Sequence, residues 1–171
     1  IFMAIKYALL ALLAEKPQTA SALQQQFIAL TEGTQTLNIG QVSQTLSRLE
    51  RNNFIARAGT VRNPSGHQVE QYEITSAGQE LLTEWLERPV IRAMTDRDEL
   101  VTKIAIAATR PDWDLISLLD TQRSAVLSQL KELNRQNRKL PQQRTAARLT
   151  IERRIYDLEA EARWLDRVEA L

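Results

Sequence analysis

The hydrophobic and polar positions between residues 38 and 78 predict a short helix, a charged β-hairpin and the start of another helix. In the first helix, apolar residues recur at helical spacing and form one narrow stripe of Ile39, Val42, Leu46 and Leu49. The opposite face of this helix carries amide, hydroxyl and guanidinium side chains: Gln41, Gln44, Thr45, Ser47, Arg48 and Arg51. Such groups read base edges or contact phosphates. Together with Arg62 and His67 near the hairpin tip, they favour a winged helix-turn-helix that binds DNA.

Two more helices are predicted ahead of this segment, over 3–15 and from a cap at Thr19 or Ser21 to about residue 30. Asn38 is a good N-cap for the third helix, because its side chain can accept a backbone N–H. Gln41 then occupies the capping-box position three residues later. Capping is therefore an alternative to base reading for Gln41.

A hairpin and a fourth helix follow. Strands are predicted at 54–59 and 68–74, on either side of a turn rich in Asn, Pro, Ser and Gly. Ser76 and Gln79 predict another capping box, for a helix that runs to about residue 87. Three helices, a hairpin and a fourth helix make up a winged helix followed by a linker helix, and we expect this DNA-binding domain to span residues 3–88.

After a predicted linker at 89–95, the pattern changes to long helices. Two long helical stretches, about 112–140 and 142–171, are separated by Pro141. Each has an apolar seam with alternating steps of four and three residues, which is typical of an antiparallel helix pair. The fold class is therefore mainly α with a small β-hairpin, with a second, helical domain over residues 96–171.

Apolar residues also lie away from these seams, among them Leu127 and Leu149. A lone helical hairpin cannot bury two apolar faces, so we expect a homodimer through this second domain. Packing of the extra faces on the first domain of the same chain is the alternative. The residues assigned to dimerisation are Leu119, Val126, Leu130, Leu133, Ile151, Ile155, Leu158 and Leu165.

Composition narrows the function classes. With no Cys and a single His, the chain offers no disulfide, no Cys-based metal site and no basis for a His-centred triad. It also lacks a phosphate-cradling Gly-rich loop. We expect no catalytic residues, no metal and no cofactor, and thus no enzyme. No apolar run approaches the ~20 residues of a membrane span, and no secretory signal pattern is present, so we expect a cytoplasmic protein.

Charge gives a local rather than a global signal. The net charge is only +1, but between residues 39 and 67 four Arg stand against one acid, Glu50. A phosphate-contacting surface needs a local basic patch of this kind. An ordinary solvated face carries a similar charge, so charge alone leaves both interpretations open.

Three segments resemble the PadR family of bacterial transcriptional regulators: 8–17 in the first helix, 40–50 in the third, and 72–78 at the end of the wing. The resemblance covers residues 3 to 88. It implies a homodimer that binds a pseudo-palindromic operator, usually as a repressor that a small effector releases. Ser43 and Gln44 stand where many members have Tyr and Pro, so no operator sequence is transferred.

The candidate site residues fall into three groups. Those expected to read bases are Gln41, Ser43, Gln44, Thr45 and Arg48. Those expected to contact phosphates or to act from the wing are Asn38, Arg51, Arg57, Arg62, Asn63 and His67. Trp85 and Trp113 are candidates for contact with a small aromatic effector, although core or interface packing is the commoner role of Trp.

Two alternatives to this function stay open. The first is a winged-helix module whose third helix docks on a protein. Its polar face lacks an aromatic anchor, which disfavours a protein hot spot. The second is a DNA-binding regulator that has no small effector.

Overall fold

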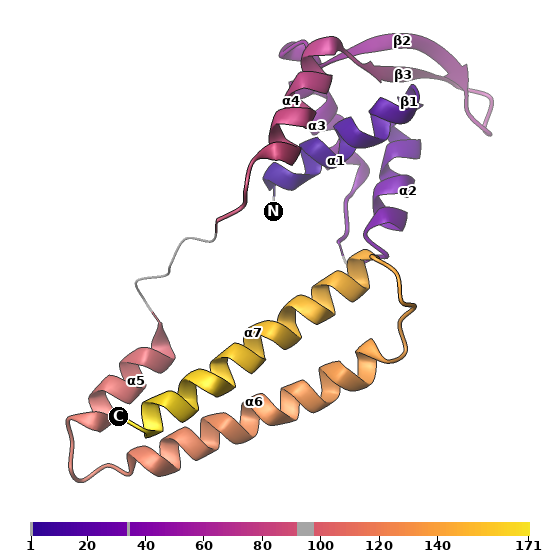
Figure 1. The fold of residues 1–171 in the computed structure, drawn as a ribbon. Coiled ribbons are helices and arrows are strands. Elements are labelled where there is room, and N and C mark those ends of the chain that lie inside the picture. The colour runs from indigo at the N-terminus through magenta and orange to yellow at the C-terminus, as the bar shows by residue number, and fades with distance from the viewer. Residues whose placement is uncertain (1, 34, 92–97) are drawn as a thin grey trace. The chain divides into compact units, whose positions relative to one another are not determined.

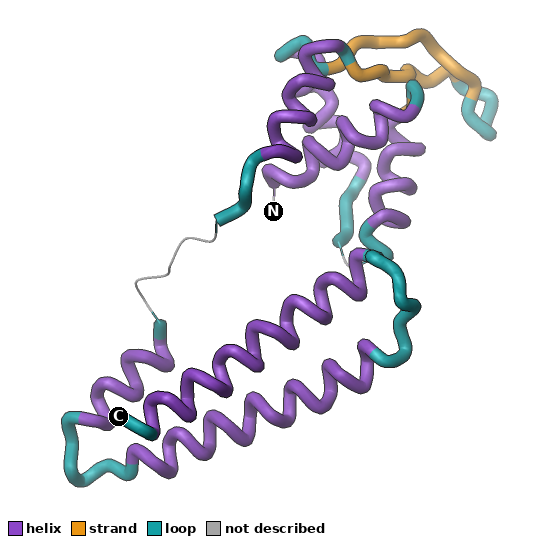
Figure 2. The backbone as a smooth tube through the Cα atoms, in the orientation of Figure 1, coloured by secondary structure: helices purple, strands orange, loops and turns teal. Residues whose placement is uncertain are grey.

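The computed structural model describes residues 2–33, 35–91 and 98–171 (Figures 1 and 2). Internal contacts divide the chain into two compact units, residues 1–91 and 92–171. Helices make up most of both units, and every strand among the described residues lies in the first (Figure 2). The predicted fold class is confirmed. Residues 92–97, which include the end of the predicted linker and the start of the predicted second domain, lie outside the described residues.

The elements of the first unit follow one another as helix, short strand, two helices, two strands and a helix. They are α1 (Phe2–Glu15), β1 (Gln18–Thr19), α2 (Ala20–Leu30), α3 (Ile39–Arg51), β2 (Ile55–Arg62), β3 (Gln68–Ile74) and α4 (Ser76–Glu87). All of the predicted elements are present, and β1 is an additional strand that the sequence pattern did not predict. β2 is also three residues longer at its C-terminal end than predicted.

Side-chain caps fix where the helices begin. The hydroxyl of Thr19 accepts the N–H of Ala22 at the start of α2. At α3, the Gln41 N–H donates to Asn38 Oδ1 (2.9 Å) and the Asn38 N–H donates to Gln41 Oε1 (3.0 Å), so the predicted capping box forms. At α4 the prediction was wrong by one residue, because Thr75 rather than Ser76 is the N-cap.

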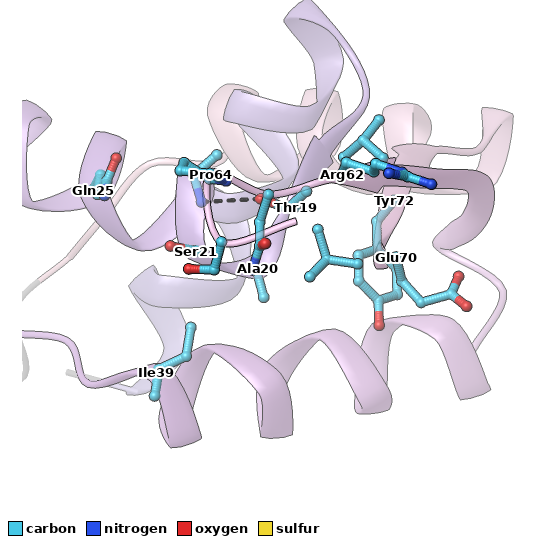
Figure 3. Close-up of a pocket in the computed structure, with 14 residues that line it drawn as sticks. Thr19, Ala20, Ser21, Gln25, Ile39, Arg62, Pro64, Glu70 and Tyr72 are labelled. Carbon is cyan, nitrogen blue, oxygen red and sulfur yellow. Dashed lines mark hydrogen bonds between the residues drawn. The ribbon is translucent and has the colours of Figure 1, made fainter. Parts of the chain in front are cut away.

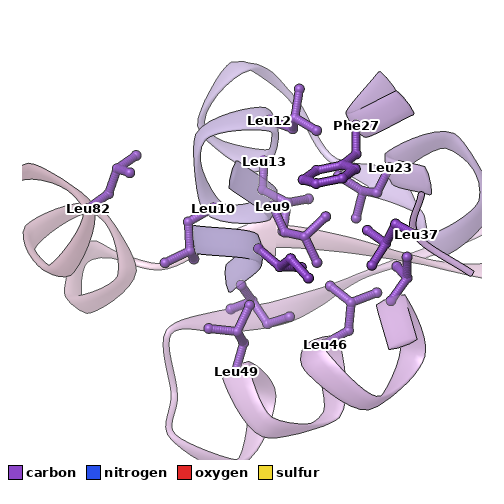
Figure 4. Packing of buried hydrophobic residues seen from close by; sticks show 13 residues of the cluster. Leu9, Leu10, Leu12, Leu13, Leu23, Phe27, Leu37, Leu46, Leu49 and Leu82 are labelled. Carbon is purple, nitrogen blue, oxygen red and sulfur yellow. The ribbon is translucent and has the colours of Figure 1, made fainter. Parts of the chain in front are cut away.

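One apolar core holds the first unit together (Figure 4). It joins residues of α1, α2, α3, β2 and α4, including Leu9, Leu23, Phe27, Leu46 and Leu82. Val42, Leu46 and Leu49 are buried as predicted, but Ile39 is 46% exposed. Ile39 is the first residue of α3 and is not part of the core cluster, so its place on the apolar stripe does not bury it.

The three strands form one antiparallel sheet in the order β1-β3-β2. β1 pairs Gln18 with Tyr72 and Thr19 with Gln71. This pairing is short, but it fastens the start of α2 directly beside the β2–β3 hairpin. The hairpin is the wing of the predicted winged helix.

In the second unit, α6 (Leu115–Asn137) and α7 (Ala146–Glu169) form a long pair, preceded by α5 (Glu99–Ala108) (Figure 1). The pair is antiparallel, because Gln122 bonds to Glu161 near one end and Arg154 bonds to Gln129 nearer the other. Arg123 reinforces the first end through Asp166 (3.1 Å). No described helix is both long enough and apolar enough to span a membrane.

Most of the predicted dimerisation residues lie in the core of this unit. Leu119, Val126, Ile155, Leu158 and Leu165 are buried within the single chain, and Leu130, Leu133 and Ile151 are half-buried. The heptad-like steps thus mark the seam between α6 and α7. Side chains buried in that seam are not available to a partner, whereas Leu127 and Leu149, which lie off the seam, are exposed.

Candidate nucleic-acid interface

The outward face of α3 is polar and accessible. Ser43, Gln44, Ser47, Arg48 and Arg51 are all exposed. Gln41 is half-buried and bonded to Asn38, so capping uses its side-chain oxygen while leaving its amide N–H₂ as a donor. The structure therefore brings three of the five predicted base readers, Ser43, Gln44 and Arg48, together on one open face.

Thr45 does not belong to that face. It is only 7% exposed, and its hydroxyl donates to the carbonyl of Gln41 one turn earlier (2.8 Å). Its placement among the exposed polar residues was wrong. A hydroxyl on the buried side of a helix is satisfied by the backbone, so a polar residue can stand there without a partner from outside.

The tip of the wing is a turn built by Asn63. The His67 N–H donates to Asn63 Oδ1 (2.8 Å), and the Asn63 N–H donates to the His67 carbonyl (2.9 Å). Gly66 adopts a φ of +81°, in the left-handed region that glycine favours. Asn63 thus shapes the turn, and the side chains of Arg62 and His67 are exposed beside it.

A groove of about 790 Å³ lies between the wing and the start of α2 (Figure 3). Its polar lining includes Ser21 and Gln25 from α2, and Arg62, Asn63 and Ser65 from the wing. Exposed Ile39 at the start of α3 and Val61 on β2 add apolar surface. The groove therefore touches α2, α3 and the wing together.

Ser21 and Gln25 were missed as candidate site residues. Their sequence context marks only the first turns of a helix, which by itself indicates no ligand. The two-residue pairing of β1 with β3 brings that turn beside the wing, and so short a strand has no hydrophobic period to detect.

The arginines of this region differ in their partners. Arg57 donates to Glu50 (2.7 Å) and lies 3.6 Å from Glu70; the hydrogen bond and attraction from Glu50 raise the pKa of Arg57 above its usual value. By contrast, no ion pair engages Arg48, Arg51 or Arg62 within the described residues. These three guanidinium groups are the ones left available for an anionic partner.

The predicted effector residues lie in different units. Trp85 on α4 stacks on Tyr7 of α1, with ring centroids 4.5 Å apart and an interplanar angle of 9°. Both rings line a pocket of about 270 Å³ with Ala8, Phe27 and Leu86 among its other walls. Trp113 is instead exposed before α6, with Arg110 over its ring (5.2 Å).

The described residues contain no group of His, Asp and Glu side chains placed to hold a metal ion. The polar side chains that gather here suit an extended anionic surface.

Each of the two units contains a segment that matches a protein-family model. Residues 9–84 match the model of the transcriptional regulator PadR-like family. Residues 97–171 match a second model, the C-terminal domain of virulence activator alpha. No curated protein shows a significant match to the sequence.

Solved structures with a similar fold span nearly the whole chain. Bacillus subtilis PadR in complex with operator DNA is 19% identical, with a TM-score of 0.58, and the match covers 98% of each chain. PadR in complex with p-coumaric acid is 20% identical, with a TM-score of 0.58, over 97% of this chain and 96% of that one. The Vibrio cholerae virulence activator AphA is 18% identical, with a TM-score of 0.52, over 97% and 96%.

Proposed function

We propose that this chain, which belongs to the PadR-like family of transcriptional regulators, binds a pseudo-palindromic operator as a homodimer and represses transcription until a small effector releases it. The family is one of regulators and not of enzymes, which agrees with the expectation from the sequence. Regulators of this kind act on chromosomal DNA, so we place the protein in the cytoplasm.

The accessible polar face of α3 carries the proposal. It presents Gln44 and Arg48 with no acidic partner, beside a wing and a groove that offer further donors. In the major groove, Arg can bond in bidentate fashion to guanine and Gln to adenine. The solved complex of Bacillus subtilis PadR with operator DNA supports DNA as the partner.

The other candidate residues contact phosphates or shape the DNA-binding surface. Arg51 follows the base-reading face at the end of α3, and Arg62 stands on the wing, so both suit phosphates on either side of the helix. Ser21 and Gln25 line the groove together with Arg62 and add neutral donors for the DNA backbone. Asn38 caps α3, and Asn63 shapes the turn of the wing beside His67. We assign these three residues secondary contacts with the DNA backbone.

We assign dimerisation to the second, helical domain, which we place at residues 96–171. Leu127, Leu149, Tyr156 and Trp164 are exposed apolar or aromatic side chains on α6 and α7. Large exposed apolar residues on a helix pair that already has its own core favour a further partner. A second copy of the chain fits, because a two-half-site operator requires two α3 helices.

The pocket beside Tyr7 and Trp85 is our site for a planar aromatic effector. Its walls are mainly apolar, and the stacked Tyr7–Trp85 pair adds aromatic surface on which a third ring can pack. The complex of Bacillus subtilis PadR with p-coumaric acid supports an effector of this class. Regulation without a small effector is the alternative. A protein that binds no planar aromatic compound would favour that alternative.

Activation rather than repression is the second candidate. It is favoured by the match of residues 97–171 to the C-terminal domain of virulence activator alpha. A reporter gene behind the cognate promoter separates the two: deletion of the regulator raises expression under repression and lowers it under activation.

The experiment that tests the function is footprinting of the full chain on the DNA upstream of its own gene, followed by titration at several salt concentrations. We expect two protected half-sites about one helical turn apart, and a steep decrease of affinity with salt. A chain that protects no DNA and shows no salt-dependent affinity would contradict the proposal and favour a protein-docking module.

A further inference from the structure

The guanidinium of Arg57 joins three elements of the first unit. Its Nε donates to Glu50 Oε1 near the end of α3 (2.7 Å), and its Nη1 lies 3.6 Å from Glu70 Oε1 on β3. Arg57 itself belongs to β2. One side chain thus bridges the DNA-facing helix and both strands of the wing.

The backbone makes this bridge possible. Pairing places Arg57 opposite Tyr72, so Glu70 is its diagonal neighbour on the same face of the hairpin. The register then shifts between Arg57 and Gly59, where Gly59 adopts a φ of +112°. A bulge of this kind bends a strand and increases its twist. The wing therefore changes direction just beyond the point where Arg57 fastens it.

We propose that Arg57 is a positioning residue that holds the wing at a fixed angle to α3, and that it is not a phosphate ligand. This inference rests on the DNA-binding function proposed above. It replaces the phosphate contact expected from the sequence. Without the bridge, α3 and the wing would still fold. They would no longer be held at the spacing that lets α3 enter one groove of the DNA while the wing contacts the adjacent groove.

Charge supports the same role. Glu50 and Glu70 border a surface meant for a polyanion, and unpaired carboxylates there would repel phosphates. The single positive charge of Arg57 offsets one of these two negative charges, and its Nε is engaged by the hydrogen bond to Glu50. A phosphate placed here would have to compete with Glu50 and Glu70 for the same guanidinium.

Arg62 provides the matched control. It lies on the same strand, carries the same side chain and lines the groove, yet no ion pair holds it within the described part of the chain. If Arg57 positions and Arg62 binds phosphate, then Arg57→Gln and Arg62→Gln will weaken DNA binding in measurably different ways.

The test uses the full chain and its footprinted operator fragment, with affinity measured by fluorescence anisotropy at several KCl concentrations. Losing one phosphate contact lowers the slope of log affinity against log salt by about 0.9, or about 1.8 for both halves of a dimer. We expect Arg62→Gln to lower the slope. We expect Arg57→Gln to weaken binding by about twofold or more, with the slope of the wild type.

A second measurement repeats Arg57→Gln in a Glu50→Gln background. Because the ion pair between Arg57 and α3 is already absent there, we expect a smaller loss of affinity than in the wild type. We also expect unchanged thermal unfolding, since exposed ion pairs add little stability. Hydroxyl-radical footprints of Arg57→Gln should lose protection by the wing and keep that by α3.

The inference is overturned if Arg57→Gln lowers the salt slope as Arg62→Gln does, if it leaves affinity unchanged, or if its loss is the same in the Glu50→Gln background. Those results all require that the wild type binds. A wild type that binds no DNA instead contradicts the proposed function itself, so the two failures are distinguishable.

Discussion

At the scale of single residues, Arg48 has the environment expected of a base reader. It is exposed on α3, free of ion pairs within the described residues, and one helical turn from Gln44. If it bonds to guanine, Arg48→Ala weakens operator binding by about 1–3 kcal/mol and relaxes the preference at one base pair. Arg48→Lys keeps the charge but loses the bidentate geometry, so it should retain the salt slope while losing that preference. A gel-shift titration in which Arg48→Ala binds like the wild type would exclude the role.

Periodicity predicted the centre of the apolar stripe on α3 better than the borders of that stripe. Val42, Leu46 and Leu49 are buried because they lie at the centre of the apolar stripe, where the core is closest. Ile39 and Thr45 were misassigned for opposite reasons. Ile39 begins the helix beyond the reach of the core, while Thr45 is buried with its hydroxyl satisfied by a backbone carbonyl. At the borders of the stripe, burial therefore depends on the position of the residue in the fold and not on whether its side chain is apolar.

At the scale of elements, the start of α4 is fastened to the connection between α3 and β2. The Thr75 hydroxyl donates to the Asn53 carbonyl (2.7 Å), and the Thr75 N–H donates to the Phe54 carbonyl (3.1 Å). A Cβ at Gly78 would lie 2.0 Å from the Phe54 oxygen and 2.8 Å from Ile74 Cγ1. The wing and α4 can approach this closely only because position 78 has no side chain.

We therefore expect Gly78→Ala to destabilise the first unit by about 3 kcal/mol, at the upper end of overpacking effects, because the nearest atom belongs to backbone. Chemical denaturation followed by Trp85 fluorescence measures the loss. Ala77→Ser, at the exposed neighbouring position on α4, should leave the transition within about 0.5 kcal/mol of the wild type. Equal stability of Gly78→Ala and the wild type would mean that α4 can shift away from the wing without loss.

Caps and turns were predictable because specific side chains are needed there. Asn38 with Gln41 and the Asn-Pro-Ser-Gly turn are recognisable from residue type, and both form. β1 was not predictable, since two residues carry no period and their pairing with Tyr72 and Gln71 depends on the rest of the fold. Ser21 and Gln25 were missed as groove residues because β1, which brings them beside the wing, was not predicted.

At the scale of the whole molecule, the Trp residues allow effector binding to be tested directly. Trp85 is stacked in its pocket, whereas Trp113 and Trp164 lie in the second unit. In a Trp113→Phe, Trp164→Phe variant, Trp85 is the remaining Trp of the three. We expect planar phenolic acids to quench its fluorescence and to weaken operator binding over the same concentration range. Quenching without an effect on DNA, or no quenching at all, would contradict this pocket as the effector site.

The heptad-like pattern of α6 and α7 had two structural explanations, and the structure separates them. A seam buried within one chain and a seam between two chains give the same alternation of four and three. Here the most buried seam residues, such as Leu119 and Leu165, pack between α6 and α7 of the same chain. The positions left for a partner follow a weaker stripe on α7, Leu149, Tyr156 and Trp164, which a search for the dominant period overlooks.

That stripe leads to the last prediction. Tyr156 is 67% exposed, although it is a large aromatic residue flanked along the helix by other exposed apolar side chains. If a second copy covers this face, Tyr156→Glu buries an unpaired charge in the interface, which shifts the dimer toward monomer and weakens binding to a two-half-site operator. The seam residues are untouched, so helix content should not change. Thr150→Glu, an exposed position on another face of α7, should stay dimeric. Sedimentation at several concentrations measures both variants. A Tyr156→Glu protein that sediments as the wild type does would show that a different surface joins the two copies, because a buried carboxylate in an apolar contact cannot be tolerated without loss of affinity.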